Sequence, residues 1–80
     1  MLRLAREAGI RGGTYPCAFN AANEVAVAAF LAGRTTFLEI AETVEHTLDT
    51  VDGSPAGDLD DLTAADAEAR RVAETALQPA

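Results

Sequence analysis

The chain has 80 residues, of which 13 are acidic and six basic, and its formal net charge is -7. A chain of this length forms a single domain, residues 1–80, and buries only roughly 60% of the surface that its unfolded state exposes. The negative charge excludes nucleic acid and anionic membrane surfaces as expected partners, because both repel an acidic protein. All six basic residues are arginine, which excludes a Schiff-base lysine and a P-loop lysine within the chain.

Hydrophobic residues make up 49% of the chain, but aromatic residues make up only 5%, and 18 residues are alanine. Alanine is the strongest intrinsic helix former, whereas strands favour alternating β-branched and aromatic residues. The composition therefore predicts an all-α domain. No apolar run approaches the ~20 residues of a membrane-spanning helix, and no secretory signal opens the chain. We therefore expect a cytoplasmic protein.

The first predicted helix covers residues 2–8 and ends at Gly9, a residue type that often follows the last helical turn. Residues 10–16 are predicted to form a loop, because Gly12 and Gly13 loosen the backbone. Pro16 disfavours helical backbone at the residue before it and so extends this loop.

The second predicted helix covers residues 20–32 and ends at Gly33. At ~100° per residue, its polar residues share a face with its larger apolar residues. This face consists of Asn20, Asn23, Glu24, Val27, Phe30 and Leu31. The opposite face carries Ala22, Val25 and Ala29, which are small enough for another element to pack closely. We therefore expect this helix to be covered on more than one side, with burial of the polar residues plausible.

The third predicted helix covers residues 37–51. Thr36 and Glu39 have the spacing of a capping box, in which each side chain bonds the backbone of the other residue. One apolar stripe follows the helical period and consists of Phe37, Ile40, Ala41, Val44, Leu48 and Val51. Polar residues lie off the stripe, so one face of this helix is predicted to be buried.

A turn-rich linker is predicted over residues 52–58, and a last helix over residues 64–77 with Thr63 as its N-cap. Its expected core stripe is Leu62, Ala65, Ala69, Val72, Ala73, Ala76 and Leu77. Asp66 and Arg70 are spaced four residues apart and are expected to pair on the helix surface. Together, one short and three longer helices predict a small four-helix bundle-like domain with no sheet.

The residues that could carry chemistry are few. Cys17 is the single cysteine and is interpreted as a small hydrophobic residue rather than a nucleophile. His46 and Glu42 have the i,i+4 spacing of a metal-ligand pair, but no third and fourth ligands accompany them. The acidic run at residues 58–61 lacks the spacing of a calcium loop and suits a helix N-terminus instead. We therefore assign no catalytic, cofactor-binding or metal-binding residue.

The segment from Asn20 to Glu24, with the sequence NAANE, allows two interpretations. Asn20, Asn23 and Glu24 form either a cluster that faces a substrate or partner, or a cap and interhelix network satisfied within the domain. From residue chemistry alone we favour the second interpretation. We therefore retain Asn20, Asn23 and Glu24 as structural or domain-interface candidates.

The order of these segments closely resembles the C-terminal region of 1-deoxy-D-xylulose 5-phosphate reductoisomerase. That family's pattern P-x-x-x-NAANE-x-x-V-x-x-FL, followed by I-x-F-x-x-I, is matched at Pro16, Asn20 to Glu24, Val27, Phe30, Leu31, Phe37 and Ile40. Thr35 departs from it, because a bulky aliphatic residue is common there. The segment DLDDLTAADAEARRVA also resembles the family's last helix, with Asp66 and Arg70 in matching places. The resemblance covers nearly the whole chain.

The resemblance implies a parent enzyme that depends on NADPH and a divalent metal (Mg or Mn). This enzyme rearranges and reduces 1-deoxy-D-xylulose 5-phosphate to 2-C-methyl-D-erythritol 4-phosphate, in non-mevalonate isoprenoid biosynthesis. The family's N-terminal Rossmann domain binds NADP, and its central domain binds substrate and metal. The chain would then be a structural domain that packs on the catalytic domain of its own parent chain, which would be a homodimer. We expect the 80 residues alone to be inactive and to hold no cofactor, as an excised or truncated product would.

A different class of function is a free-standing helical module that binds another protein through an apolar groove. An exposed apolar face on a folded domain would fit either hypothesis, since a separated domain also exposes its former interface.

Overall fold

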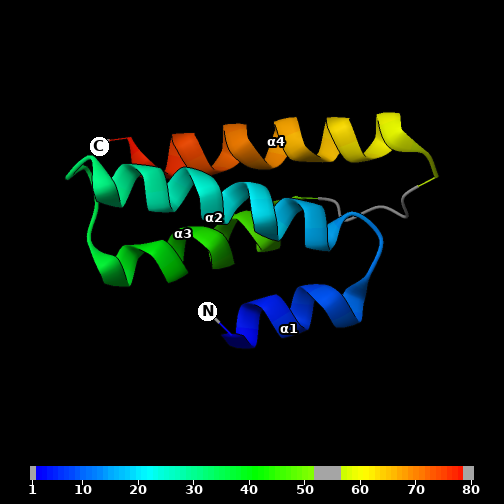
Figure 1. Ribbon diagram of the computed structural model, residues 1–80, viewed down its shortest axis with the longest axis horizontal. Helices are drawn as coiled ribbons and strands as arrows, with labels where there is room; N and C mark the ends of the chain where they lie inside the picture. The colour runs from blue at the N-terminus through cyan, green and yellow to red at the C-terminus, as the bar shows by residue number, and fades with distance from the viewer. Residues whose placement is uncertain (1, 52–56, 79–80) are drawn as a thin grey trace.

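The computed structural model describes residues 2–51 and 57–78. These residues form four α-helices: α1 (Leu2–Arg11), α2 (Tyr15–Leu31), α3 (Phe37–Thr50) and α4 (Leu59–Leu77) (Figure 1). They contain no β-strand, and the all-α prediction is confirmed. Within the described ranges, no helix has the length and apolar character needed to cross a bilayer.

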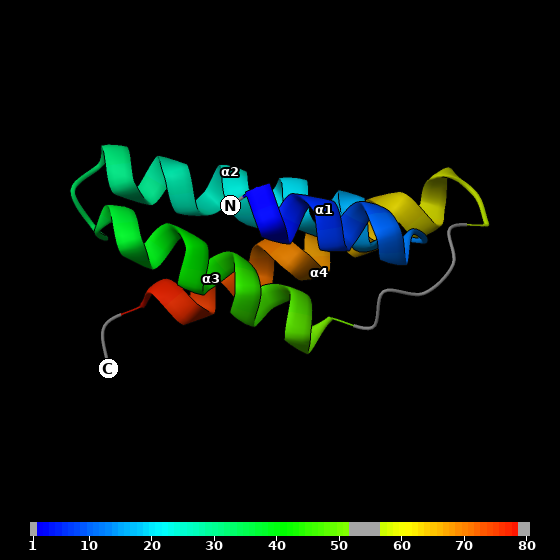
Figure 2. The same cartoon turned by 90° about the horizontal axis from the view of Figure 1, so that it is seen from below.

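Helix α2 is the centre of the bundle. It packs against α1, α3 and α4, and α3 also contacts α1 and α4 (Figures 1 and 2). The described parts of α1 and α4 share no such contact and lie on different sides of α2 (Figure 1). The prediction that α2 is covered on more than one side is therefore confirmed.

The first helix is longer than predicted, because Gly9 lies inside it. Gly12 and Gly13 have φ of 68° and 57°, and the Gly12 amide donates to the Ala8 carbonyl oxygen at 3.0 Å. Two consecutive residues in the left-handed region end the helix more firmly than one glycine with helical backbone. A glycine inside a helix costs only about 1 kcal/mol relative to alanine.

The predicted start of the second helix at Asn20 is wrong. Helix α2 begins at Tyr15 with Pro16 in its first turn. Proline is tolerated there because the first-turn amides have no partner within the helix. The restriction on the residue before proline is a bias, and Tyr15 overrides it, with its amide donating to the Gly12 carbonyl oxygen at 3.1 Å. The NAANE segment therefore lies inside α2 and not at its start.

The C-terminal end of α2 is formed as predicted around Gly33. Gly33 has φ of 77°, and its amide donates to the Phe30 carbonyl oxygen at 3.0 Å. The Arg34 amide donates to the Ala29 carbonyl oxygen at 2.8 Å. This pair of bonds is a Schellman motif, which satisfies the last carbonyl groups of the helix and reverses the chain into α3.

The capping box of α3 is confirmed. The Glu39 amide donates to Thr36 Oγ1 at 3.3 Å, and the Thr36 amide donates to Glu39 Oε1 at 3.1 Å. Hydrogen bonds that the side chain and backbone of Thr36 donate to the Glu39 carboxylate lower the pKa of Glu39 from its ordinary value, because they stabilise the ionised form.

The predicted start of the last helix is wrong, because Asp58 and not Thr63 is the N-cap. Its side chain accepts the Asp61 amide at 3.0 Å, while Thr63 donates its hydroxyl to the Leu59 carbonyl oxygen inside α4 at 3.0 Å. Aspartate and threonine are both favoured at N-cap positions. The acidic residues that follow Asp58 are stabilised in a first helical turn by the helix dipole, which favours Asp58 as the cap. Of the predicted linker, residues 52–56 lie outside the described part.

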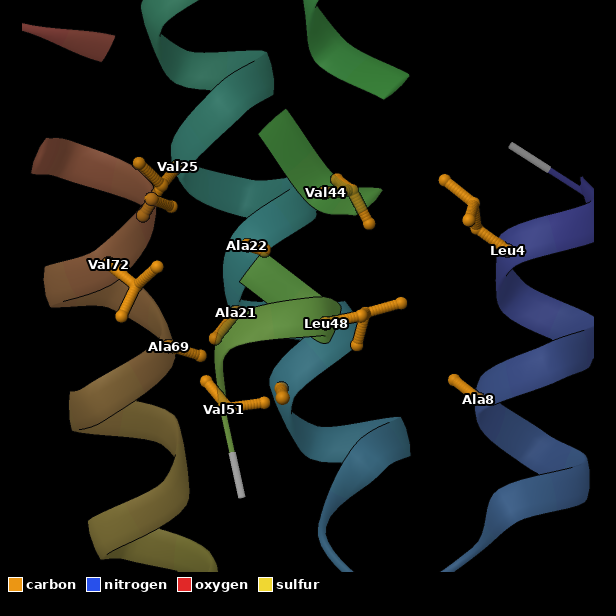
Figure 3. Close-up of a cluster of buried hydrophobic side chains, with 12 residues drawn as sticks. Leu4, Ala8, Ala21, Ala22, Val25, Val44, Leu48, Val51, Ala69 and Val72 are labelled. Atoms are coloured by element: carbon orange, nitrogen blue, oxygen red, sulfur yellow. The ribbon is translucent and has the colours of Figure 1, made fainter. Parts of the chain in front are cut away.

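The core consists mainly of small side chains (Figure 3). Helix α2 buries Ala18, Ala21, Ala22, Val25, Ala26 and Ala29. The other helices contribute Leu4, Ala8, Ile40, Val44, Leu48, Ala69, Val72 and Ala73, and Val51 follows α3. The closely packed small face predicted for α2 is therefore confirmed.

Some burial predictions for α3 and α4 are wrong. Phe37 belongs to the predicted apolar stripe but is 72% exposed, because it begins α3 at the edge of the bundle. Ala76 is exposed near the end of α4. Thr43 and Thr47 are buried although they lie off the predicted stripe. The Thr47 hydroxyl is satisfied locally, by donating to the Thr43 carbonyl oxygen at 2.8 Å.

We predict that Ala22→Leu destabilises the domain by about 1–3 kcal/mol, because Ala22 is fully buried and extra methylenes overpack a close helix contact. Chemical denaturation checks this value. Ala28→Leu is the matched control, since Ala28 is exposed on the same helix. An equal decrease in the free energy of unfolding of both variants would contradict the close packing of α2.

We also predict a pH dependence from Glu39. The pKa of Glu39 is lower in the folded state than in the unfolded state. Its contribution to stability is therefore present above the unfolded-state pKa and is lost as the pH falls through the folded-state pKa. The wild-type chain should therefore lose stability relative to Glu39→Gln as the pH falls below 4.5, the ordinary value for this carboxyl group. Thermal melts of both proteins across this range check it, and parallel curves would contradict it.

Candidate functional site

The three candidate residues of the NAANE segment lie on the outer side of α2. Asn20 and Glu24 are exposed, and Asn23 is partly buried. The larger apolar residues of the same predicted face are also not in the core: Val27 is partly buried, Phe30 is 38% exposed and Leu31 is 77% exposed. The sequence left open whether these residues are buried, and the structure leaves Asn20 and Glu24 exposed, because alanines and not the large residues face the neighbouring helices.

Glu24 joins α2 to α4 through a charged network. Arg70 Nη2 donates to Glu24 Oε2, and Arg70 Nε donates to Asp66 Oδ2 at 2.8 Å. The predicted Asp66–Arg70 pair is thus present, and Glu24 extends it across the helix contact. Bonds to Asp66 first, and then to Glu24, raise the pKa of Arg70 above its ordinary value. All three side chains are between 37% and 55% exposed, so the network is a surface feature that connects α4 to α2 and contributes little stability.

Cys17 lies close to this network. Its thiol Sγ donates to the Leu62 carbonyl oxygen at 3.4 Å, which links α2 to the first turns of α4. Partial burial raises the pKa of Cys17, and the charge of Asp66 raises it further. A raised pKa favours the protonated thiol, which is a weaker nucleophile than the thiolate.

His46 and Glu42 are both exposed on α3. They line a shallow depression together with Glu39, Thr43, Ala76 and Leu77. In the part of the chain that the structure describes, no three histidine, cysteine or carboxylate side chains are grouped so that they could hold a metal ion. In the acidic run, Asp58 caps α4 and Asp61 accepts the Gly57 amide at 2.7 Å, so these carboxylates complete the helix start.

An apolar groove lies between α2 and α3, at a position that sequence reasoning did not identify. Its volume is about 330 Å³, and it is lined by Asn23, Val27, Phe37, Leu38, Ile40 and Ala41. Leu38 is 76% exposed, and the rings of Phe30 and Phe37 meet edge to face at 6.0 Å between centroids. Contiguous exposed apolar surface marks an interaction site. The sequence signal was the cluster of large apolar residues on both sides of Gly33.

These features define the class of protein: a small all-α domain whose polar motif borders an exposed apolar groove. The family model described as the DXP reductoisomerase C-terminal domain matches residues 1–72. The chain therefore belongs to the family of DXP reductoisomerase C-terminal domains.

The individual relatives agree. The 1-deoxy-D-xylulose 5-phosphate reductoisomerase of Xanthomonas campestris pv. campestris (strain B100) is 57% identical over 76 residues, which cover 95% of this chain and 19% of the relative. The reductoisomerase of Bacteroides fragilis is 50% identical over 72 residues, which cover 90% of this chain and 19% of the relative. The chain thus spans about a fifth of the length of these relatives.

A solved structure is similar over nearly the whole chain. It is the 1-deoxy-D-xylulose 5-phosphate reductoisomerase from Zymomonas mobilis in complex with NADPH, with a TM-score of 0.92 and 44% identity. The match covers 99% of this chain and 21% of that chain. It confirms the helical architecture and the resemblance found in the sequence.

We predict that Glu24→Gln lowers the melting temperature by only about 1–4 °C, because exposed ion pairs contribute little. The decrease should become smaller in high salt, which screens surface charges. Glu68→Gln is the control, since Glu68 is exposed on α4. If the two variants melted at the same temperature in low salt, the network would not stabilise the contact between α2 and α4.

Proposed function

We propose that the chain is the C-terminal structural domain of an NADPH-dependent 1-deoxy-D-xylulose 5-phosphate reductoisomerase. The parent would convert its substrate to 2-C-methyl-D-erythritol 4-phosphate for isoprenoid synthesis, in the cytoplasm and as a homodimer. The carrying observation is 57% identity over 95% of this chain with a relative five times as long. Residues 1–80 form one domain in this proposal, and Asn20, Asn23 and Glu24 belong to its interface with the catalytic domain.

The chemistry of the chain supports an architectural role. NADPH and a sugar phosphate are both polyanions, and a chain with net charge -7 repels them. Four of its six arginines are engaged within the domain: Arg3, Arg34 and Arg70 form ion pairs with carboxylates, and Arg11 lies over the Tyr15 ring.

The described residues do not fit a metal site either, since they provide no set of three grouped ligands. The proposal therefore assigns the Mg or Mn ion, the NADPH and the substrate to other domains of the parent.

A domain exchange tests the proposal. The matched 76 residues of the Xanthomonas campestris enzyme are replaced by the corresponding residues of this chain, and NADPH oxidation with the deoxyxylulose phosphate is measured. We expect activity within about tenfold of the parent enzyme. The same enzyme truncated before the exchanged region is the control. A folded chimera without activity would contradict the proposal.

The isolated 80-residue chain should neither bind NADPH nor oxidise it with the same substrate. Measurable turnover by the purified chain would assign chemistry to this domain and would contradict the architectural role.

A further inference from the structure

The apolar groove lies directly ahead of the N-terminal end of α1. Helix α1 packs on both α2 and α3. Arg3 bonds Glu45 at 3.4 Å, while Arg11 at the other end of α1 lines a small cavity with Asp49. Helix α1 therefore runs in the same direction as α3, with its first turn beside Glu45. Ala41, one helical turn before Glu45, already lines the groove.

The groove is uncovered because α1 is shorter than its neighbours. Helix α1 has 10 residues and α2 has 17. At 1.5 Å per residue, the difference corresponds to about 10 Å of helix. Figures 1 and 2 both show α2 and α3 continuing past the N-terminal end of α1, towards the turn that joins them. About seven helical residues, or three extended ones, would cover this length.

The direction of the chain indicates what covers the groove. The chain matches about a fifth of the length of its relatives, and it belongs to a family described as a C-terminal domain. In such relatives, the polypeptide that precedes α1 joins the N-terminal end of this helix from the side of the groove. We propose that the segment directly preceding residue 1 in the full-length reductoisomerase places apolar side chains in the groove formed by Val27, Phe37, Leu38, Ile40 and Ala41. This inference rests on the proposed function.

Asn23 gives this docking site one polar element. It lines the groove and is partly buried, and its amide has both donor and acceptor groups for the backbone of the docked segment. The motif that marks the family thereby borders the segment joining this domain to the rest of the enzyme.

Chain extension tests the inference. About ten residues that immediately precede the matched region in the Xanthomonas campestris relative, enough to span the groove as helix, are fused before residue 1. Tethering gives the segment a high effective concentration. We expect the extension to raise the melting temperature by at least about 4 °C. The same ten residues in scrambled order should give no increase.

Leu38→Asp should remove this gain, whereas Leu59→Asp should keep it. The two leucines are 76% and 75% exposed, but Leu59 begins α4 and does not line the groove. Each variant is compared with and without the extension, so the stability of the variant itself cancels. A gain that survives Leu38→Asp, or no gain at all, would overturn the inference.

A second copy is the competing occupant. If the unextended chain were a dimer that Leu38→Asp dissociates, and the extension added no stability, the groove would belong to that copy and the inference would be wrong. An active domain-exchange chimera alongside this result would leave the proposed function intact.

Discussion

The fold depends on the small size of the side chains that α2 buries. Five of its six buried residues are alanine, so the backbones of α1, α3 and α4 can approach it on several sides. Each alanine buries little apolar area, and stability must come from many close contacts rather than from a few large side chains. The largest fully buried side chains are Val44 and Thr47. The larger apolar residues Phe37 and Leu38 lie outside, where they are available for another polypeptide.

The parts of the fold that follow from local rules could be predicted. The capping box at Thr36, the glycine end of α2 and the apolar period of α3 each depend on residues within a few positions of one another. The starts of α2 and α4 were predicted less accurately, because two local signals at each start indicated different first residues for the helix. Pro16 permits both a loop and a first helical turn, and Asp58 and Thr63 are both good caps.

The fate of the other face of α2 could not be predicted in the same way. The sequence indicated close packing at Ala22, Val25 and Ala29, but it did not show whether Val27, Phe30 and Leu31 would also enter the core. Their position outside it follows from tertiary packing, which no local pattern contains. The contact between Glu24 and Arg70 spans 46 positions in the sequence. The groove likewise depends on the relative lengths of α1, α2 and α3. The motif thus identified the family, while the surface around it required the structure.

The contact between α2 and α4 also sets the order in which the domain can be completed during synthesis. Ala69, Val72 and Ala73 of α4 belong to the same core cluster as the alanines of α2. During synthesis α2 is made before α4, so its inner face stays exposed to solvent until Ala69, Val72 and Ala73 have been made and can pack on it. A domain of this design therefore closes only when its own fourth helix becomes available, after any preceding domains have had time to fold.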